Sequence, residues 1–169
     1  MSKKNENLTD LVCATTDSKE FLIFRLGDRE YGFDIQYVIQ LRGYGNVTTI
    51  PNAPRYIKGV INLHGGLVQI NDLRTQFNIG DPVYNEFTVV IILSMHGKTF
   101  GFVVDSVADV IQFTAEQVRP MPSFDALGDT GLFAGIGTID TRVVVLFDAV
   151  KLMLDSALPP DAEFYSHTL

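Results

Sequence analysis

The residue types that most often perform chemistry are few in this sequence and widely spaced. The histidines, His64, His96 and His167, have no partner at the spacing of a metal site. Cys13 is the only cysteine and lies in a polar N-terminal stretch, which makes it a poor nucleophile candidate. The stretch Gly135-Ile136-Gly137 lacks the rest of the dinucleotide-binding fingerprint. We therefore expect no metal, no cofactor and no catalytic residue.

Four aspartates could in principle supply paired carboxylates for acid–base chemistry: Asp34, Asp72, Asp105 and Asp148. Asp72 and Asp148 each precede a helical pattern, however, where a carboxylate normally accepts hydrogen bonds from free backbone N–H groups. Asp34 also stands before a short helical pattern. Capping explains these positions more simply than catalysis does. The sequence therefore favours a binding protein, whose surfaces carry the function, over an enzyme.

The composition bounds the class of protein. A chain of 169 residues that is 46% hydrophobic can bury a core as one domain or two joined lobes. The formal net charge of −7 argues against nucleic-acid binding. One cysteine excludes an internal disulfide and fits a reducing compartment. Because no apolar run reaches about 18 residues, we expect no direct membrane insertion, and a cytoplasmic protein.

Frequent Val, Ile and aromatic residues predict mainly β-structure with short helices. Residues 59–74 read as a hairpin that turns at Gly65-Gly66 and leads into a helix capped by Asp72. The stretch 87–93 is apolar at nearly every position, which predicts a strand buried on both faces. A short helix is expected after Asp34, with Ile35, Val38 and Ile39 on its apolar face.

The two halves of the chain repeat each other. Tyr31-Gly32-Phe33 matches Phe100-Gly101-Phe102 at an offset of 69 (101 minus 32). Gly59 and Asp72 match Gly135 and Asp148 in the sequence at an offset of 76. The difference predicts a seven-residue insertion, which we place in the loop from 120 to 131. Since each half is near the lower size limit for an independent core, two small barrels packed together are expected.

Several segments, taken in order, resemble the CheW-like coupling proteins of bacterial chemotaxis. They are 21–35, Arg42-Gly43-Tyr44, 57–63, Asp72-Leu73-Arg74, 101–107 and 114–120. The resemblance implies two SH3-like five-stranded β-barrels with short helices, mainly β in class. We assign residues 1–18 to an N-terminal tail, 19–154 to the CheW-like domain and 155–169 to a C-terminal tail. The first barrel is expected at roughly 19–84 and the second at roughly 85–154, although strands could cross between them.

The family resemblance implies a non-enzymatic adaptor that joins chemoreceptor cytoplasmic tips to a chemotaxis histidine kinase in membrane-associated receptor arrays. The kinase regulatory domain, which has the same double-barrel fold, would bind Val38, Gln40, Leu41 and Gly59. A methyl-accepting receptor would dock between the barrels near His64, Leu67 and Val90. The far face of the second barrel would make a further ring contact with another kinase domain. For Val38 and Val90, core packing is an equally good explanation.

The chain departs from the family pattern at two places. His64 stands where the family usually has Arg, and Gln69-Ile70-Asn71 where it often has Pro-Ile-Val. Arg carries a permanent charge and a forked donor, whereas the charge of His responds to pH. Receptor binding here would then be weaker, more pH-sensitive or directed to other receptors. Alternatively, His64 is simply a tolerated turn residue.

Three other functions stay open on sequence grounds. A paralogous coupling protein for surface motility or gene expression would look the same. A small-ligand or oligonucleotide-binding barrel would need a basic aromatic groove, which the acidic balance disfavours. An enzyme would need a convergent polar cluster that these residues do not supply.

Overall fold

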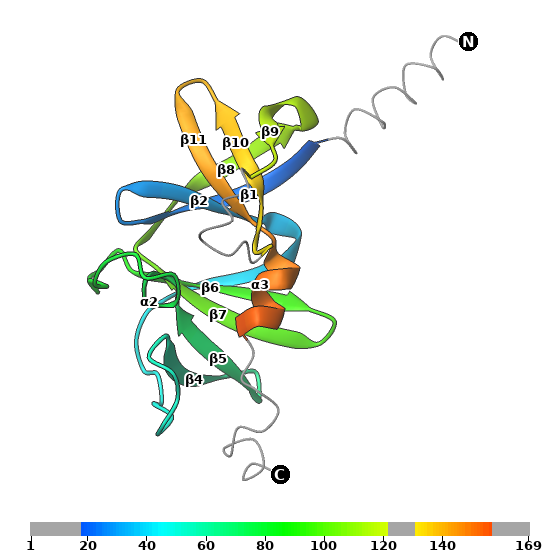
Figure 1. The fold of residues 1–169 in the computed structure, drawn as a ribbon. Coiled ribbons are helices and arrows are strands. Elements are labelled where there is room, and N and C mark those ends of the chain that lie inside the picture. The colour runs from blue at the N-terminus through cyan, green and yellow to red at the C-terminus, as the bar shows by residue number, and fades with distance from the viewer. Residues whose placement is uncertain (1–17, 122–130, 157–169) are drawn as a thin grey trace.

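The computed structural model describes residues 18–121 and 131–156, which form two β-sheets stacked one above the other (Figure 1). The upper sheet, sheet A, has the order β8-β1-β2-β11-β10-β9. Its strands are β1 (Ser18–Leu26), β2 (Arg29–Asp34), β8 (Ser106–Thr114), β9 (Val118–Arg119), β10 (Phe133–Ile139) and β11 (Arg142–Phe147). The short helices that accompany it are η1 (Ile35–Tyr37), η2 (Ala115–Gln117) and α3 (Ala149–Ser156).

The lower sheet, sheet B, has the order β3-β6-β7-β5-β4. Its strands are β3 (Val38–Gly43), β4 (Ile57–Leu63), β5 (Gly66–Asp72), β6 (Val89–Met95) and β7 (Lys98–Val104), and α2 (Leu73–Gln76) follows β5. An isolated bridge between Thr48 and Val60 adds the segment after β3 to the free edge of β4. The architecture is two SH3-like barrels, which we name barrel A and barrel B after their sheets. This confirms the predicted fold class.

The barrels do not follow the predicted boundaries at 19–84 and 85–154, because hairpins cross between the halves of the chain. Barrel A combines β1 and β2 with strands β8 to β11, whereas barrel B is built from the continuous stretch from β3 to β7. Two parallel ladders join the halves: β2 pairs with β11, and β7 pairs with β5. Each half of the chain therefore completes the barrel that the other half begins.

The strand registers confirm the internal duplication. Gly32 faces Leu146 in barrel A, and its equivalent Gly101 faces Ile70, the equivalent of Leu146, in barrel B. The β-bulges repeat as well. The β1–β8 ladder skips Ala108 and the β6–β3 ladder skips Ile39, its equivalent 69 residues earlier. The two barrels thus repeat the same strand pairing, including the position of a β-bulge.

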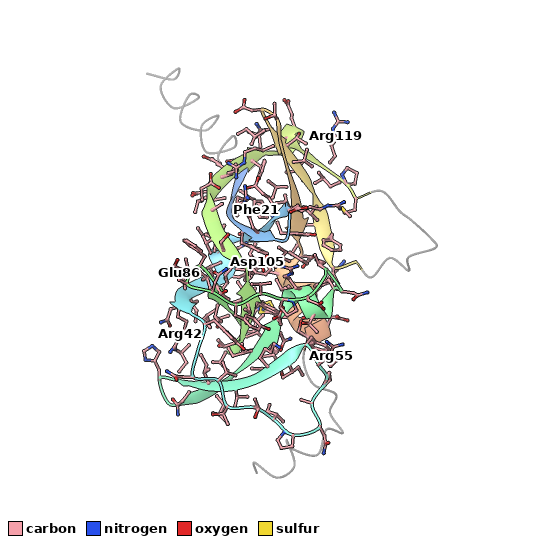
Figure 2. The ribbon with its side chains drawn as sticks, turned by 90° about the vertical axis from the view of Figure 1, so that its left-hand side faces the viewer. Phe21, Arg42, Arg55, Glu86, Asp105 and Arg119 are labelled. Carbon is pink, nitrogen blue, oxygen red and sulfur yellow. The ribbon has the colours of Figure 1, made fainter. Side chains whose placement is uncertain are left out.

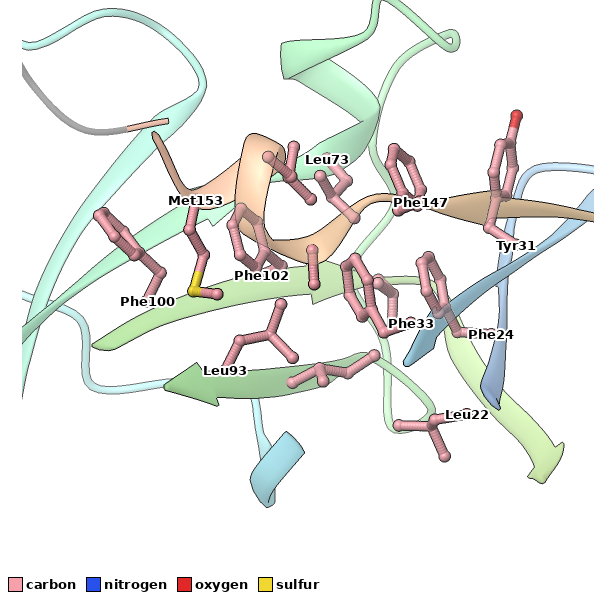
Figure 3. Close-up of a cluster of buried hydrophobic side chains, with 14 of the residues drawn as sticks. Leu22, Phe24, Tyr31, Phe33, Leu73, Leu93, Phe100, Phe102, Phe147 and Met153 are labelled. Atoms are coloured by element: carbon pink, nitrogen blue, oxygen red, sulfur yellow. The ribbon is translucent and has the colours of Figure 1, made fainter. Parts of the chain in front are cut away.

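Buried apolar side chains form three clusters. Barrel A has its own core, which includes Phe21 and Ile23, and barrel B has one that includes the equivalent Val90 and Ile92. A third and larger cluster lies between the barrels, and Figure 3 shows most of its members. Alternate residues of β1 and of β6 point into a barrel core and into this shared core. The prediction of a strand buried on both faces at 87–93 is confirmed for β6.

Three local expectations need correction. The helix expected after Asp34 is only the single turn η1, because Val38 and Ile39 continue as strand β3, which suits their β-branched side chains. The β4–β5 turn is centred on His64-Gly65 with φ of 52° and 86°, while Gly66 already pairs with Leu63. Positive φ at both central residues is the requirement of a type I′ turn, and histidine tolerates it better than most residues. The β-branched stretch 47–50 also predicts a short strand, but among these residues only Thr48 pairs, through its bridge to Val60.

Some expectations concern the ends of the chain and the insertion. The N-terminal tail lies outside the described residues, except that Ser18 already belongs to β1. Helix α3 continues two residues beyond the predicted domain end, through the buried Ser156. Most of the predicted insertion, at 122–130, and the rest of the C-terminal tail, at 157–169, also fall outside the described residues. Within the described ranges, no helix is long and apolar enough to cross a membrane.

An ion-pair network fastens the outer surface of barrel A. Arg142 on β11 donates to both oxygens of Glu30 on β2, at 3.0 and 2.8 Å, and to both oxygens of Asp109 on β8, at 2.9 and 3.0 Å. Since β8 and β11 are not neighbours in the sheet, the guanidinium bridges strands that the backbone ladders do not join directly. Its hydrogen bonds hold the pKa of the Asp109 carboxyl below its ordinary value of 3.8.

This network predicts an acid-sensitive contribution to stability. Because the pKa of Asp109 is lower in the folded state, the contribution is present above the unfolded value and is lost as the pH falls through the folded one. We expect Arg142→Met to lower the free energy of urea unfolding near about pH 6, with the loss shrinking towards about pH 3. Asp109→Asn should remove part of that pH dependence. Equal losses for Arg142→Met at both pH values would contradict this account.

Candidate interaction surfaces

Strand β3 exposes an apolar pair at the edge of barrel B. In the described residues β3 pairs only with β6, and Ile39 and Leu41 are 56% and 45% exposed. Ile39 is the residue of the bulge. The predicted contacts Val38 and Gln40 alternate with this pair and are half-buried, and Val38 packs against the shared core. Ile39 and Leu41 are therefore the side chains of this strand that another protein can reach.

Gly59, another predicted kinase contact, has a structural reason to be glycine. It is buried with φ of 146°, and a Cβ atom there would lie 2.0 Å from the Thr48 carbonyl oxygen. That close approach allows Thr48 and Val60 to exchange two backbone hydrogen bonds of 2.9 Å each. Gly59 thereby allows the segment that follows β3 to pair with β4 and close barrel B.

The predicted receptor contacts separate into two groups. His64 and Leu67 share the exposed end of the β4–β5 hairpin, and Leu67 is 65% exposed. The Asn62 side chain accepts a hydrogen bond from the Gly65 amide at 3.0 Å, which fixes this turn. Val90, by contrast, is 3% exposed and packs in the core of barrel B. The structure thus brings His64 and Leu67 together and leaves Val90 inside the barrel, where the alternative of core packing accounts for it.

All four aspartates considered for acid–base chemistry have structural partners. Asp72 caps α2, accepting from the amides of Arg74 and Thr75 at 2.9 and 3.3 Å. Asp148 caps α3 and Asp34 caps η1 in the same manner. These observations confirm the capping interpretation of the three residues.

Asp105 joins the two barrels where the chain passes from β7 to β8 (Figure 2). Its carboxylate accepts from the Gly27 amide at 2.8 Å and from Arg74 Nη1 at 2.8 Å. The first donor belongs to the β1–β2 turn of barrel A and the second to α2, which follows β5 of barrel B. Arg74 in turn donates through Nε to the Ile79 carbonyl at 2.9 Å. This carboxylate therefore fixes the relative position of the barrels.

One side of barrel B is filled by an interaction that no sequence pattern indicates. The Tyr84 hydroxyl donates a short hydrogen bond to Asp72 Oδ2, and Asp72 is almost completely buried. The Tyr84 ring stacks on Tyr44 with ring centroids 4.7 Å apart, and Lys58 Nζ lies 5.3 Å from the Tyr84 centroid. Burial and the bond to Asp72 hold the pKa of Tyr84 well above its usual range. Tyr84 lies in the irregular loop between α2 and β6, where no periodicity points to it.

Across residues 18–121 and 131–156, no three His, Cys, Asp or Glu side chains come together in a group that could hold a metal ion. Besides the ion pairs and caps above, the described polar side chains include a group of amides, Gln69, Asn71 and Gln76, that bond to one another or to Ser156. Exposed apolar side chains lie on the β3 edge and at the end of the β4–β5 hairpin, and also include Phe87, Val110 and Val143. Exposed apolar side chains on a rigid frame are typical of protein contacts.

Comparison with known proteins agrees with this architecture. A CheW-like domain family model matches residues 20–157. The chain is 47% identical to "Chemotaxis protein CheW" of Klebsiella aerogenes over 138 residues, which cover 82% of this chain and 83% of that protein. It is 31% identical over 140 residues to "Probable chemotaxis protein CheW" of Rhizobium etli, covering 82% and 89% of the two. The crystal structure of the scaffolding protein TtCheW from Thermoanaerobacter tengcongensis matches with a TM-score of 0.71 at 30% identity, covering 77% and 88% of the chains.

The fold, its exposed apolar edges and these similarities define an adaptor built from two fused SH3-like barrels. The chain belongs to the CheW-like family, and its function is that of a chemotaxis coupling adaptor.

Gly59→Ala tests whether this glycine is needed for the fold. We expect the variant to lose more than about 2 kcal/mol of unfolding free energy, because the new methyl group meets backbone atoms and φ is strained. Urea denaturation followed by circular dichroism measures this. Gly43→Ala is the matched control on β3, since a Cβ there meets nothing within 4 Å. If the two variants were equally stable, Gly59 would have to be explained by partner binding alone.

Proposed function

We propose that this protein joins the cytoplasmic tips of chemoreceptors to the regulatory domain of a chemotaxis histidine kinase within membrane-associated receptor arrays, and that it does so without enzymatic activity of its own. The observation that carries the proposal is the 47% identity to a chemotaxis CheW protein over 138 residues. The structure supplies what such a role needs: a rigid double barrel and separate apolar surfaces on β3 and on the β4–β5 hairpin.

The kinase-facing surface is the β3 edge. Leu41 and Ile39 supply exposed apolar area, and burying it against a second protein would contribute about 25 cal/mol for each Å² removed from water. Gln40 lies between them and offers an amide for hydrogen bonding. Val38 and Gly59 act indirectly, since the first anchors β3 on the shared core and the second closes the barrel.

Leu41→Glu should weaken kinase binding while leaving the fold intact. A charge on this exposed position costs little stability, but desolvating it in a complex is unfavourable. We expect at least about a tenfold loss of affinity for the kinase regulatory domain, measured by calorimetry. Kinase that sediments with receptor-containing membranes in the presence of the wild-type chain should be lost with the variant.

Val110→Glu provides the matched control. Val110 on β8 is the equivalent of Leu41 at an offset of 69 (110 minus 41), and both are 45% exposed. The control should retain binding of the regulatory domain to barrel B in solution, because Val110 lies on the other barrel, where only the further ring contact with a second kinase domain is expected. Unchanged binding by Leu41→Glu would remove β3 from the interface. Kinase sedimentation that did not depend on the chain at all would contradict the adaptor role.

The receptor-facing surface is the end of the β4–β5 hairpin. Leu67 offers an exposed apolar contact beside the His64 side chain at the turn. Val90 supports this surface from inside the barrel, because its side chain packs in the same core as Ile61 and Val68 of the hairpin. We propose that the receptor approaches this end of the hairpin from the groove between the barrels.

His64→Arg tests the departure from the family pattern. The variant gains a permanent charge and a forked donor, so we expect tighter receptor binding and less variation between about pH 6 and 8. Co-sedimentation with receptor-containing membranes at both pH values measures this. The control is His96→Arg, because His96-Gly97 forms the β6–β7 turn with the same signs of φ, 49° and 79°. If the wild-type chain, His64→Arg and His96→Arg all bound receptor equally well at both pH values, His64 would be only a tolerated turn residue.

A further inference from the structure

Barrel A has two adjacent cavities that share part of their lining. They measure about 290 and 340 Å³ and have Lys19, Phe21 and Ala134 in common. The first extends to Asp148 at the start of α3, and the second to Phe113 on β8. Such volumes lie near the lower end of the range for small-ligand sites.

The equivalent place in barrel B is filled by Tyr84. Phe113 corresponds to Tyr44 at an offset of 69 (113 minus 44). Ala134 and Asp148 correspond to Lys58 and Asp72 at an offset of 76. These three residues of barrel B are the ones that hold Tyr84, through ring stacking, the overlying ammonium group and the hydrogen bond from the hydroxyl.

Asp148 presents its carboxylate in the same way as Asp72. Its Oδ1 accepts from the Lys151 amide at 3.1 Å, just as Oδ1 of Asp72 accepts from Thr75, the equivalent of Lys151. Within the described residues no donor reaches Asp148 Oδ2, whereas Tyr84 occupies that oxygen in Asp72. The other carboxylate of the cavity, Asp34, already accepts through both oxygens from Gln36.

The chain does not supply a second tyrosine at the corresponding place. The residue equivalent to Tyr84 is Thr15 (84 minus 69), which has no aromatic ring. The small Ala134 side chain also stands where Lys58 covers the Tyr84 ring in barrel B. The site therefore keeps the aromatic wall and the acceptor of its twin, and no described residue takes the place that Tyr84 has in barrel B.

We propose that this pocket of barrel A binds the side chain of a tyrosine presented by a partner protein. The ring lies between Phe113 and Ala134, and the phenol hydroxyl donates to Asp148 Oδ2. Lys19 and Lys151 at the rim are exposed cations, so they favour a segment with acidic residues beside the tyrosine. The pocket is separate from the β3 edge and the hairpin end, both of which belong to barrel B.

Short peptides test the chemistry directly in the full-length chain by amide NMR titration. We expect acetyl-Glu-Tyr-Glu-amide to shift the amide signals of Ala134, Asp148 and Lys151. The corresponding Glu-Phe-Glu and Lys-Tyr-Lys peptides should each bind at least about fivefold more weakly, because one lacks the hydroxyl and the other has the wrong charge. Equal affinities for the Tyr and Phe peptides, or no shifts at these three amides, would overturn the proposal.

Asp148→Asn isolates the hydroxyl contact. Asparagine retains the helix cap but replaces the free acceptor with an amide donor, so the preference for Tyr over Phe should disappear while the fold persists. Ala134→Leu should block both peptides by filling the cavity. Asp28→Asn, in the exposed β1–β2 turn, is the control for removing a negative charge and should leave the preference unchanged. Retention of the preference in Asp148→Asn would overturn the assigned contact.

One further variant distinguishes a partner from the chain itself. Tyr165, outside the described residues, could compete for the pocket, so the titrations are repeated with Tyr165→Ala. We expect the same peptide affinity as in the wild-type chain. Binding that appeared only in Tyr165→Ala would make the chain's own C-terminal segment the occupant and would overturn the assignment to a partner.

Discussion

The structure depends on the exchange of hairpins between the two halves of the chain. The parallel ladders β2–β11 and β7–β5 are the only backbone ladders in the described residues that run between an N-terminal hairpin of one half and the C-terminal hairpin of the other. Without them each half would have an open sheet and a core near the lower limit of independent stability. The exchange also places β1 and β6 in the middle of the molecule, where both faces of each strand are buried. The fold is for this reason one cooperative unit.

Because of the duplication, the two barrels have the same backbone arrangement but differ in their surface side chains. Leu67 on β5 and its equivalent Val143 on β11 are both exposed, as are Leu41 and Val110. The differences arise from single side chains placed on matching backbone. A loop tyrosine fills one side of barrel B, whereas none of the residues that the structure describes fills the matching cavity of barrel A. One backbone pattern can thus support different contacts on its two copies.

Local patterns in the sequence were sufficient for most strands, for the caps and for the duplication. Alternating or continuous apolar residues indicate strands, and Asp72 and Asp148 stand at the only positions a cap could take before their helices. The family resemblance then indicated two barrels. A helix was predicted after Asp34 because Ile35, Val38 and Ile39 fit a helical period. The prediction was wrong because β3 pairs with β6. Such pairing is set by tertiary contacts, which override local propensity.

The candidate sites were harder to predict from the sequence, because they too depend on tertiary contacts. The apolar stretch 87–93 predicted burial of Val90, but it did not show that this side chain lies against Gly101 of β7 in the core of barrel B. The need for Gly59 becomes visible only when Thr48 approaches it, and Tyr84 becomes important only because Asp72 is buried beneath its loop. His64 was identified as a turn residue and as a departure from its family, and its φ of 52° explains why the turn accepts it.

The β2–β11 ladder also has a consequence for how the protein is made. Glu30 pairs with Val144, which is synthesised 114 residues later (144 minus 30). During translation, β2 leaves the ribosome with one edge that has no permanent partner until almost the whole folded region has followed. Barrel B, built from a continuous stretch, is complete much earlier and can offer β6 and β7 as a surface on which the waiting hairpin packs. A ribosome stalled before residue 142 would leave an unpaired strand edge exposed, and such edges promote aggregation.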